Sequence, residues 1–471
     1  MNLKILLMIY FSLHINAIHI NAQFNGSACS FDFLRSRLVK EHKDLEYKYI
    51  KDSIRSTLTN IGFYERYKDF LDKFGSRLTG TKNLERAIHY IINLTREFGL
   101  QAVTEEVKVP YWHRLEEEVF MILPRRKKMS VLGLGGSVST PYPDGITSDV
   151  IVANSFEEFN DIPDDMIEGK IVLFNANFTN YVETVKYRVD SASIAAQKGA
   201  VAVLVKSVTP FSLYTPHTGA LRYVDSINKI PAASITLEDA DLINRFYRKG
   251  KQVVIHMKLF STRYHKKSRN IIIDLKGTVE PEKIVIVSGH IDSWDVGQGA
   301  IDNGGGMMIS WAVPIVLHLK NHYPQRTIRT ILWTGEEQGL IGGQAYIKKH
   351  KNELDLIDYV LESDAGTFQP EGLRAAGSES ANCIIKIILD LLAPTNKLVE
   401  DNNVGSELSL FVKKGIPGAS LLTKDDRYFW YHHSDADTIN AQNQTDVENC
   451  GIFWTTLAFV IADFPDDIPR D

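Results

Sequence analysis

The sequence predicts an α/β fold, in which helices flank a mainly parallel central sheet and a β-rich domain is inserted. From residue 269 onward, apolar strand-like runs alternate with helical stretches, which is the pattern of βαβ units. Short β runs separated by Pro and Gly clusters occupy residues 125–260, and a helical period occupies residues 45–99. The chain has 471 residues, so two domains, or one domain with a large insertion, are expected.

Composition and charge bound the possible partners. Hydrophobic residues make up 44% of the chain and charged residues 24%, with a formal net charge of -5 and both signs interspersed. This pattern gives no basic stripe for nucleic acid and no polybasic block for a membrane surface. Small molecules or peptides are therefore the expected ligands.

The N-terminus has the pattern of a secretory signal peptide over residues 1–22. Lys4 precedes an apolar run, and small-residue sites follow at Ala17 and Ala22. A membrane-spanning helix needs about 20 apolar residues, and this run is too short to be an anchor. We therefore expect a protein without a membrane anchor that is secreted, or lumenal in the secretory pathway or lysosome.

Further features agree with export from the cytosol. Four N-x-S/T sequons are candidate glycosylation sites, at Asn25, Asn93, Asn177 and Asn443.

The three cysteines are too few to be the scaffold of the fold. Cys29 lies in a polar, poorly patterned segment, residues 23–44, which we expect to be a propeptide cleaved on activation. Three cysteines leave one unpaired, and the pairing among them stays open, with Cys383 and Cys450 as the predicted candidate pair.

The first part of the folded chain is predicted to be helical. The stretch "YERYKDFLDKFGSRLTGTKNLERAIHYIINLTREFGL" has apolar residues three and four positions apart, with a Gly-rich break from Gly75 to Gly80. Two helices flanking a loop fit this pattern. In the middle of the chain, "DVIVAN", "GKIVLFN", "AVAVLVKS" and "QVVIHMKL" are predicted strands, and "STPYPDG" and "YTPHTG" are turns.

Polar side chains follow three strands of the last segment, at the point where each strand ends. "KIVIVSG" leads to His290, "TIRTILWTG" to Glu336 and Glu337, and "IDYVLES" to Asp364. Ligands bind at the carboxyl edge of an open α/β sheet, so these groups are expected to converge there.

Two further groups complete a candidate metal site. Asp302 stands just before "GGGMMISWAVPIVLHL", and His433 lies in "YFWYHHSDADT". Each of these residues alone is more often a turn or solvated residue, but their coincidence with the strand ends favours a site. Two histidines and three carboxylates can hold two divalent cations with one carboxylate bridging, and such donors suit zinc.

The motifs "SGHIDSWDVGQGAIDNGGG", "WTGEEQG", "ESDAGTF" and "HHSDADT" resemble the zinc-binding motifs of the co-catalytic di-zinc exopeptidases, the aminopeptidase and glutamate carboxypeptidase family. The resemblance extends from "SRLTGTKNLERAI" to the C-terminus. It implies a zinc-exopeptidase fold of the phosphorylase/hydrolase-like type. Residues 45–120 and 266–471 would form the peptidase domain, and residues 121–265, with "GKIVL", "AAQKGAVAVLV" and "IPAASIT", a protease-associated insert.

The resemblance also implies two Zn²⁺ per subunit. Asp302 would bridge the two ions, with His290 and Asp364 on one of them and Glu337 and His433 on the other. A cis peptide bond after Asp302 is also implied.

Two carboxylates are assigned to catalysis. Glu336 would be the general base that activates a bridging water, and Asp292 would fix the imidazole tautomer of His290. The match to "H-S-x-x-D-T" selects His433 rather than its neighbour His432 as the ligand.

Small peptides, chiefly dipeptides with free termini, are the implied substrates, and a homodimer is the implied assembly. In "RYFWYHH", Arg427 and Tyr431 are predicted to wall the substrate pocket, and aromatic core packing is the alternative for Phe429 and Trp430. Two other functions are weighed: a broader-specificity zinc aminopeptidase, and below it a non-catalytic binding ectodomain of the same fold. The presence of every ligand and of the base disfavours the ectodomain.

Overall fold

The computed structural model describes residues 43–393, 395–424 and 427–470. The predicted signal peptide, and the predicted propeptide apart from its last two residues, lie outside this part of the chain, as do Asn25 and Cys29. Among the described residues, one helical stretch is long and apolar enough to cross a membrane, Ala300–Leu319, and it is buried within the protein except at its last two residues.

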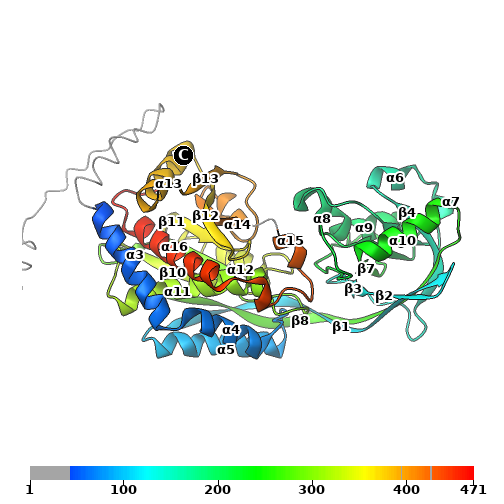
Figure 1. Ribbon diagram of the computed structural model, residues 1–471, viewed down its shortest axis with the longest axis horizontal. Coiled ribbons are helices and arrows are strands. Elements are labelled where there is room, and N and C mark those ends of the chain that lie inside the picture. Colours follow the sequence, from blue (N-terminus) through cyan, green and yellow to red (C-terminus); the bar gives the residue numbers. More distant parts are fainter. Residues whose placement is uncertain (1–42, 394, 425–426, 471) are drawn as a thin grey trace, which may run out of the picture.

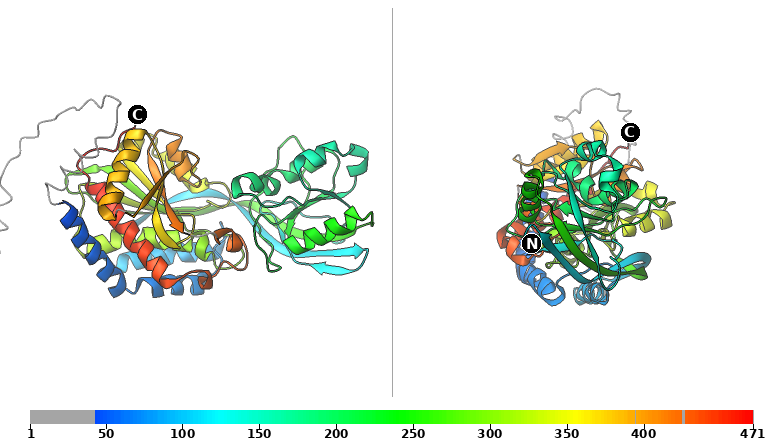
Figure 2. Two further views of the ribbon diagram at one scale, coloured as in Figure 1. Left: turned by 45° about the horizontal axis from the view of Figure 1, so that its top comes forward. Right: turned by 90° about the vertical axis from the view of Figure 1, so that its right-hand side faces the viewer.

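The described chain forms two lobes that a long two-stranded ribbon connects (Figure 1). The ribbon consists of β1 (Ala102–Leu123) and β8 (Val254–Leu275), which pair antiparallel along nearly their whole length. The left view of Figure 2 shows the same separation of the lobes from another direction. Residues 124–253, between the ribbon strands, make the smaller lobe, which we call the inserted lobe. The predicted boundaries at residues 121 and 265 thus fall within the ribbon strands.

The larger lobe is built on a mixed sheet whose middle is parallel. Its strand order is β13-β12-β14-β11-β9-β10-β8, and β14, β11, β9 and β10 run in the same direction. The predicted α/β fold with a mainly parallel central sheet is therefore confirmed. Besides β8, its strands are β9 (Glu280–His290), β10 (Arg326–Trp333), β11 (Ile357–Glu362), β12 (Gln369–Ala376), β13 (Lys397–Glu400) and β14 (Gly418–Lys424).

Helices cover both faces of this sheet. One face packs against α3 (Lys43–Asn60), α4 (Phe63–Phe74), α5 (Lys82–Glu97), α11 (Gly305–Leu319), α13 (Glu379–Leu392) and α16 (Gln444–Asp463). The other packs against α12 (Ile341–Lys349) and α14 (Leu408–Val412). Successive residues of β9 alternate between the two layers: Val285 and Val287 face the first, Ile284 and Ile286 the second. Burial on both faces explains why this strand is apolar throughout.

The helices predicted on either side of Gly75–Gly80 are α4 and α5. Helix α5 begins at a cap in which the side chain of Thr81 accepts from the backbone N–H of Leu84.

Helix α11 lies at the centre of the larger lobe and contains Pro314. Proline has no N–H to donate to the carbonyl of Ser310, one turn earlier in the helix. Thr330 Oγ1 of β10 donates to that carbonyl instead, at 3.1 Å. The neighbouring strand therefore satisfies the acceptor that the proline leaves open.

The inserted lobe is an α/β layer rather than a β-rich domain. Four of its strands run parallel in the order β4-β5-β6-β7, and β3 adds antiparallel to β7. Separate apolar clusters cover the two faces of this sheet. Its relation to a protease-associated domain stays a prediction. The elements are β2 (Lys127–Met129), β3 (Val131–Gly133), β4 (Ile146–Ala153), α6 (Phe156–Asp161), α7 (Asp164–Ile167), β5 (Ile171–Phe174), α8 (Tyr181–Val189), α9 (Ser191–Gln197), β6 (Ala202–Lys206), β7 (Ala232–Ile235) and α10 (Leu237–Arg248).

The predicted disulfide between Cys383 and Cys450 is wrong. Cys450 lies in α16 as a free, fully buried thiol, and its Sγ donates to the carbonyl of Phe368 at 2.9 Å. It behaves as a small apolar core residue, which its position in the sequence alone does not reveal.

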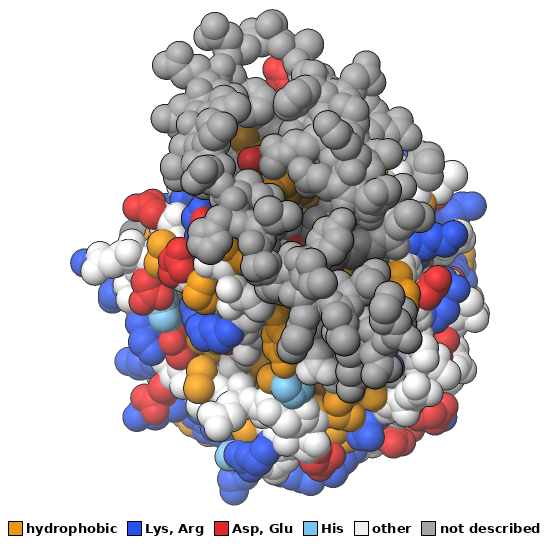
Figure 3. Space-filling view, turned by 90° about the vertical axis from the view of Figure 1, so that its left-hand side faces the viewer, with side chains coloured by type: hydrophobic (Ala, Val, Ile, Leu, Met, Phe, Trp, Pro, Cys, Tyr) orange, Lys and Arg blue, Asp and Glu red, His pale blue; other side chains and the backbone are white. Residues whose placement is uncertain are grey.

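The surface of the larger lobe carries both signs of charge. On the face shown in Figure 3, acidic and basic side chains are interspersed among the described residues.

The three sequon asparagines in the described chain, Asn93, Asn177 and Asn443, are exposed. Glycan attachment at these positions stays a prediction.

Candidate metal centre

Three neighbouring parallel strands bring predicted site residues to one edge of the large sheet. His290 is the last residue of β9, which lies between β10 and β11. Glu336 and Glu337 follow the end of β10, and Asp364 follows the end of β11. Because the three strands run in the same direction, their carboxyl ends meet, and the side chains that follow them converge.

Asp302 reaches the same place from a π-helical turn, η1 (Ala300–Gly304), directly before α11. The predicted cis peptide bond between Asp302 and Asn303 is present. The carboxylate of Asp437 holds the turn, because Oδ1 accepts from two of its backbone N–H groups at 2.8 and 2.7 Å. Oδ2 of Asp437 accepts from the N–H of Asp302 at 3.2 Å. Asp437 thus anchors the turn that presents Asp302.

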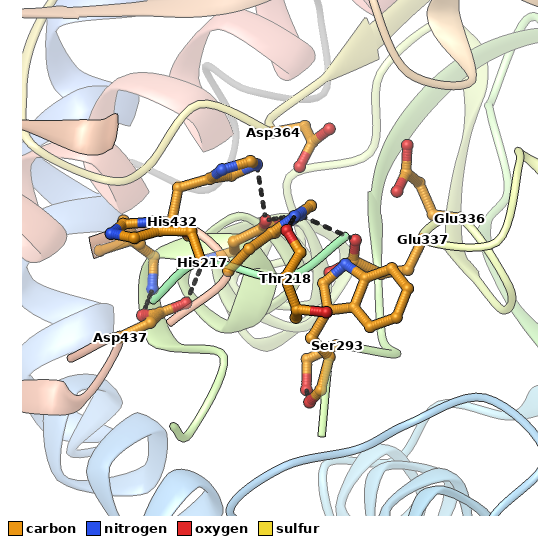
Figure 4. Close-up of polar contacts among 12 residues, drawn as sticks. His217, Thr218, Ser293, Glu336, Glu337, Asp364, His432 and Asp437 are labelled. Atoms are coloured by element: carbon orange, nitrogen blue, oxygen red, sulfur yellow. Dashed lines mark hydrogen bonds and ion pairs between the residues drawn. The ribbon is translucent and has the colours of Figure 1, made fainter. Parts of the chain in front are cut away.

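The converging side chains form two groups that share Asp302. Glu337, Asp364 and His432 of this centre are labelled in Figure 4. In the first group, His290 Nε2 lies 3.1 Å from Asp302 Oδ1 and 3.0 Å from Asp364 Oδ1. In the second, His433 Nε2 lies 3.0 Å from Asp302 Oδ2 and 3.0 Å from Glu337 Oε2. Asp302 therefore turns one oxygen toward each group, as the predicted bridging role requires.

Buried negative charge is in excess at this centre. Burial, together with the Asp302 carboxylate, raises the pKa of Glu337 to about 7, and burial raises the pKa of Glu336 well above its usual range. Burial lowers the pKa of His433, but Glu337 and Asp302 outweigh it and bring the value to about 9. Oε1 of Glu337 is buried without a hydrogen-bond partner among the described residues. A cation between these carboxylates would offset the charge, and imidazole nitrogen with carboxylate oxygen is a donor set that fits zinc.

Glu336 stands beside the two groups without joining them. Its Oε2 lies 3.9 Å from His290 Nε2, which is beyond hydrogen-bond distance. The side chain faces the adjoining cavity. This is the placement expected of a proton-transfer group that is not a ligand.

Asp292 lies beside His290, as predicted, but its backbone carbonyl is nearer to the imidazole than its carboxylate is. His290 Nδ1 lies 3.0 Å from the backbone carbonyl of Asp292, and 3.7 Å from its carboxylate. The carboxylate accepts instead from Thr79 Oγ1 at 2.7 Å and from the N–H groups of Glu336 and Glu337 at 3.3 and 3.4 Å. The carbonyl therefore orients the imidazole, and the carboxylate positions the turn that carries the two glutamates.

Both histidines of the "HH" pair lie at the centre. Their rings stack with centroids 3.5 Å apart, and His432 Nε2 lies 3.4 Å from Asp302 Oδ2. His433 Nε2 lies near the carboxylates of both Asp302 and Glu337, whereas, among the described carboxylates of the cluster, His432 Nε2 lies near that of Asp302 alone. The geometry agrees with the choice of His433 as the ligand.

A cavity of about 1160 Å³ lies over the metal centre. The carboxylates of the centre form part of its wall, and Tyr181 and Arg188 of the inserted lobe line it as well. From the segment before His433, which forms α15 (Tyr428–Tyr431), the lining residues are Tyr428 and Phe429. Both lobes therefore contribute to the cavity.

The two residues predicted to wall the substrate pocket, Arg427 and Tyr431, do not line this cavity. Arg427 is exposed, and Tyr431 is at the end of α15. Trp430 stacks on Phe211 of the inserted lobe with centroids 4.3 Å apart, so it packs rather than lines the cavity. A helical turn at this position presents other residues to the cavity than the linear sequence indicates.

Arg77 is a site residue that sequence reasoning did not find. It is fully buried in the Gly-rich break between α4 and α5. The segment that links His290 to Asp302 is fixed by this guanidinium, which donates to the backbone carbonyls of Gly75, Ile291, Gln298 and Gly299. Its partners are distant in sequence, so only the glycines around it marked the segment as unusual.

Comparison with known proteins agrees with this architecture. Residues 270–458 match Peptidase family M28. The chain is 41% identical to carboxypeptidase Q of Xenopus laevis over 443 residues, which are 93% of this chain and 94% of that relative. The chain belongs to peptidase family M28. The predicted resemblance to the di-zinc exopeptidase family, and within it to carboxypeptidase Q, is confirmed.

Solved structures share the fold of this M28 peptidase. A peptidase M28 precursor from Shewanella amazonensis superimposes with a TM-score of 0.86 at 28% identity, covering 91% of this chain and 99% of the other. A zinc aminopeptidase from Bacillus subtilis has a TM-score of 0.66 at 21% identity, covering 89% of this chain and 98% of the other. At that identity the second likeness shows the fold alone.

Replacement of Asp437 by Asn should weaken metal retention although Asp437 touches no predicted metal position. Asn offers one acceptor oxygen and turns an amide N–H toward a backbone N–H of the π-helical turn, so Asp302 loses its support. Loss of a supporting partner typically costs roughly 10- to 100-fold in metal affinity. Zinc transfer to a chelator would measure this in the M28 peptidase, with the exposed Asp435→Asn as control. Equal transfer rates for the two variants would contradict the supporting role.

Proposed function

We propose that this M28 peptidase is a zinc exopeptidase that hydrolyses small peptides, chiefly dipeptides with free termini. The observation that carries the proposal is the position of the carboxylate and imidazole cluster, in the wall of a cavity to which both lobes contribute. A short peptide fits such a cavity, whereas a folded chain does not. Family membership and the relatives named carboxypeptidase Q support peptide hydrolysis.

The proposed centre holds two Zn²⁺ per subunit. His290 and Asp364 would hold one ion and His433 and Glu337 the other, with Asp302 contributing one oxygen to each. When bound, zinc supplies Lewis acidity, which polarises the scissile carbonyl and makes water a better nucleophile near neutral pH.

Glu336 would move the proton. Its carboxylate faces the cavity beside the centre, so Oε2 can accept a proton from the attacking water and pass it to the nitrogen of the departing amine. The Asp292 carboxylate holds the backbone N–H of Glu336 and fixes the position from which this side chain works. Residues of the inserted lobe, Tyr181 and Arg188 among them, line the cavity beside Glu336.

The lining of the cavity offers both signs of charge to a short peptide. The carboxylates of the centre attract a free amine, and the cationic Arg188, Lys229 and Arg263 are also lining residues and attract a free carboxylate. This supports substrates with two free ends. A broader zinc aminopeptidase is the alternative, supported by the fold shared with the zinc aminopeptidase of Bacillus subtilis.

Dipeptides and their C-terminally amidated forms would separate these two functions. We expect amidation to lower kcat/KM by at least ~10-fold, because a charge-assisted hydrogen bond is worth roughly 1.5–3 kcal/mol. Chelator-treated enzyme is the blank for both series. Equal hydrolysis of free and amidated peptides would favour the aminopeptidase, and hydrolysis of both by the metal-free protein would sink the proposal.

Substitution of the adjacent glutamates, Glu336 and Glu337, should have opposite effects on metal retention. Glu336→Gln should keep both metals and lower kcat by at least ~10²-fold, because general acid–base groups contribute about 10² to 10⁴-fold. Glu337→Gln should instead release metal, because it removes an anionic ligand from the second group. Zinc content and kcat, measured on both variants at equal protein concentration, compare the two roles directly.

Two results would contradict this assignment. Metal loss in Glu336→Gln with retention in Glu337→Gln would reverse the roles. Unchanged turnover in both variants would refute catalysis at this centre.

We also propose that the protein works outside the cytosol, secreted or in the secretory pathway or lysosome, as a homodimer. The N-terminal leader pattern and the exposed sequon asparagines support export. The dimer rests on family resemblance. Expression in cultured cells should yield exported protein whose mass falls on endoglycosidase treatment. Retention in the cytosol at the unglycosylated mass would exclude this location.

A further inference from the structure

The inserted lobe contacts the metal centre through its backbone. The N–H of Thr218, in the segment between β6 and β7, donates to the carbonyl of His433 at 2.9 Å. In return, His433 Nδ1 lies 3.2 Å from the carbonyl of Thr218. The residue before it takes part as well, because His217 Nδ1 lies 2.6 Å from the carbonyl of His432. Figure 4 shows His217 and Thr218 beside His432.

These contacts hold His433 in an unusual conformation. Its φ of 61° lies in the left-handed region, which residues with a side chain seldom adopt. Both the carbonyl and the ring nitrogen of His433 are engaged by the same residue, Thr218. Because Thr218 holds His433 at its carbonyl and at ring atom Nδ1, Nε2 is directed toward Asp302 and Glu337, each 3.0 Å away.

The same contact selects the tautomer of the ring. A histidine that binds metal through Nε2 must carry its proton on Nδ1. The Thr218 carbonyl can only accept, so it stabilises a proton on Nδ1. Arg188 NH1 lies 3.3 Å from Nδ1, but a guanidinium only donates, so it would favour the tautomer that cannot bind metal. Arg188 NH1 also lies 3.4 Å from the Thr218 carbonyl, which gives that donor another acceptor.

A second contact fixes Thr218 relative to the metal-binding loop. Its Oγ1 donates to the carbonyl of Gly133 at 2.9 Å, within the inserted lobe. Arg114 donates to Thr218 Oγ1 at 3.3 Å and to both oxygens of Asp295 at 2.9 and 3.0 Å. Asp295 lies in the segment between His290 and Asp302, so the lobe and this segment are tied together.

We propose that the inserted lobe is part of the metal centre, with Thr218 as a positioning residue whose backbone sets the orientation and tautomer of His433. Retention of one of the two metal ions then depends on the docking of this lobe. The inference rests on the proposed function in one respect, the role of His433 as a ligand. It goes further than the proposed function, because it assigns the inserted lobe a role in positioning the metal ligand His433 in addition to lining the cavity.

Two substitutions of Thr218 distinguish the contribution of its backbone from that of its side chain. Thr218→Pro removes the N–H that holds His433, and Thr218→Val keeps the N–H and the carbonyl and removes only Oγ1. Both proteins would be loaded with Co²⁺, whose visible absorption reports the geometry of its ligands. We expect Thr218→Pro to change the spectrum of one of two bound ions and to speed the chelator release of that ion roughly 10- to 100-fold. Thr218→Val, which loses only the Oγ1 contacts with Gly133 and Arg114, should change the spectrum and the release rates less than Thr218→Pro does.

A third variant covers the case in which Thr218→Pro does not fold. Gly219 has φ +143°, and a Cβ added there would lie 2.3 Å from Arg188 Cζ. A side chain at this φ strains the backbone and the added Cβ crowds the Arg188 guanidinium, so Gly219→Ala shifts the backbone next to the Thr218 carbonyl, and Arg188 with it, while every backbone donor and acceptor stays in place. Circular dichroism and thermal unfolding of the metal-free proteins verify that each variant is folded. The same change at one ion is expected.

The possible results test the role of the inserted lobe separately from the proposed function. Wild-type spectra and release rates in folded Thr218→Pro and Gly219→Ala would overturn the role of the lobe while the metal centre stands. Equal effects of Thr218→Val and Thr218→Pro would overturn the assignment to the backbone. Failure of the wild-type protein to bind Co²⁺ would overturn the proposed function, and this inference with it.

Discussion

The centre depends on one buried carboxylate whose two oxygens serve two different imidazoles. Asp302 lies 3.1 Å from His290 and 3.0 Å from His433, and it is 5% exposed. A carboxylate in such surroundings would be costly to bury without positive charge nearby. Its place is set by the backbone rather than by these contacts, because the π-helical turn is fastened at three N–H groups by Asp437. The segment of residues 433–437 therefore supplies both His433, which faces Asp302, and Asp437, which anchors the turn that carries Asp302.

Around this carboxylate, the fold supplies positions and the charged groups supply chemistry. Parallel strands bring three segments to one edge, and the buried guanidinium of Arg77 fixes the loop that joins the first segment to Asp302. Strand β1 has a register shift between Arg114 and Glu117, and there the Arg114 side chain donates to Asp295 of that loop. Most of these contacts lead to backbone atoms, so the geometry of the centre depends on chain path more than on any one side chain.

The sequence was informative where function follows from a local pattern. His290, Glu337 and Asp364 could be predicted because each follows an apolar run, and parallel strands place such positions together. Contacts between distant segments left no such pattern, which is why Arg77 and Thr218 were missed. Predictions were wrong or incomplete where the position of a residue in the sequence was used to infer where its side chain lies in space. One helical turn presents Tyr428 and Phe429 to the cavity, rather than Arg427 and Tyr431. Cys450 is enclosed in α16, where no disulfide forms.

Strand β8 belongs to the sheets of both lobes at once. Residues near its start pair with β4, and residues near its end pair with β10. Side chains of a strand alternate between its two faces, so loss of a single residue from the middle of β8 would turn one half inside out. Among the described pairs, the ribbon departs from regular register only between Arg114 and Glu117 and between Met121 and Leu123. Homologous chains should therefore change the length of this ribbon by two residues at a time, or at these bulges, while loops vary freely in length.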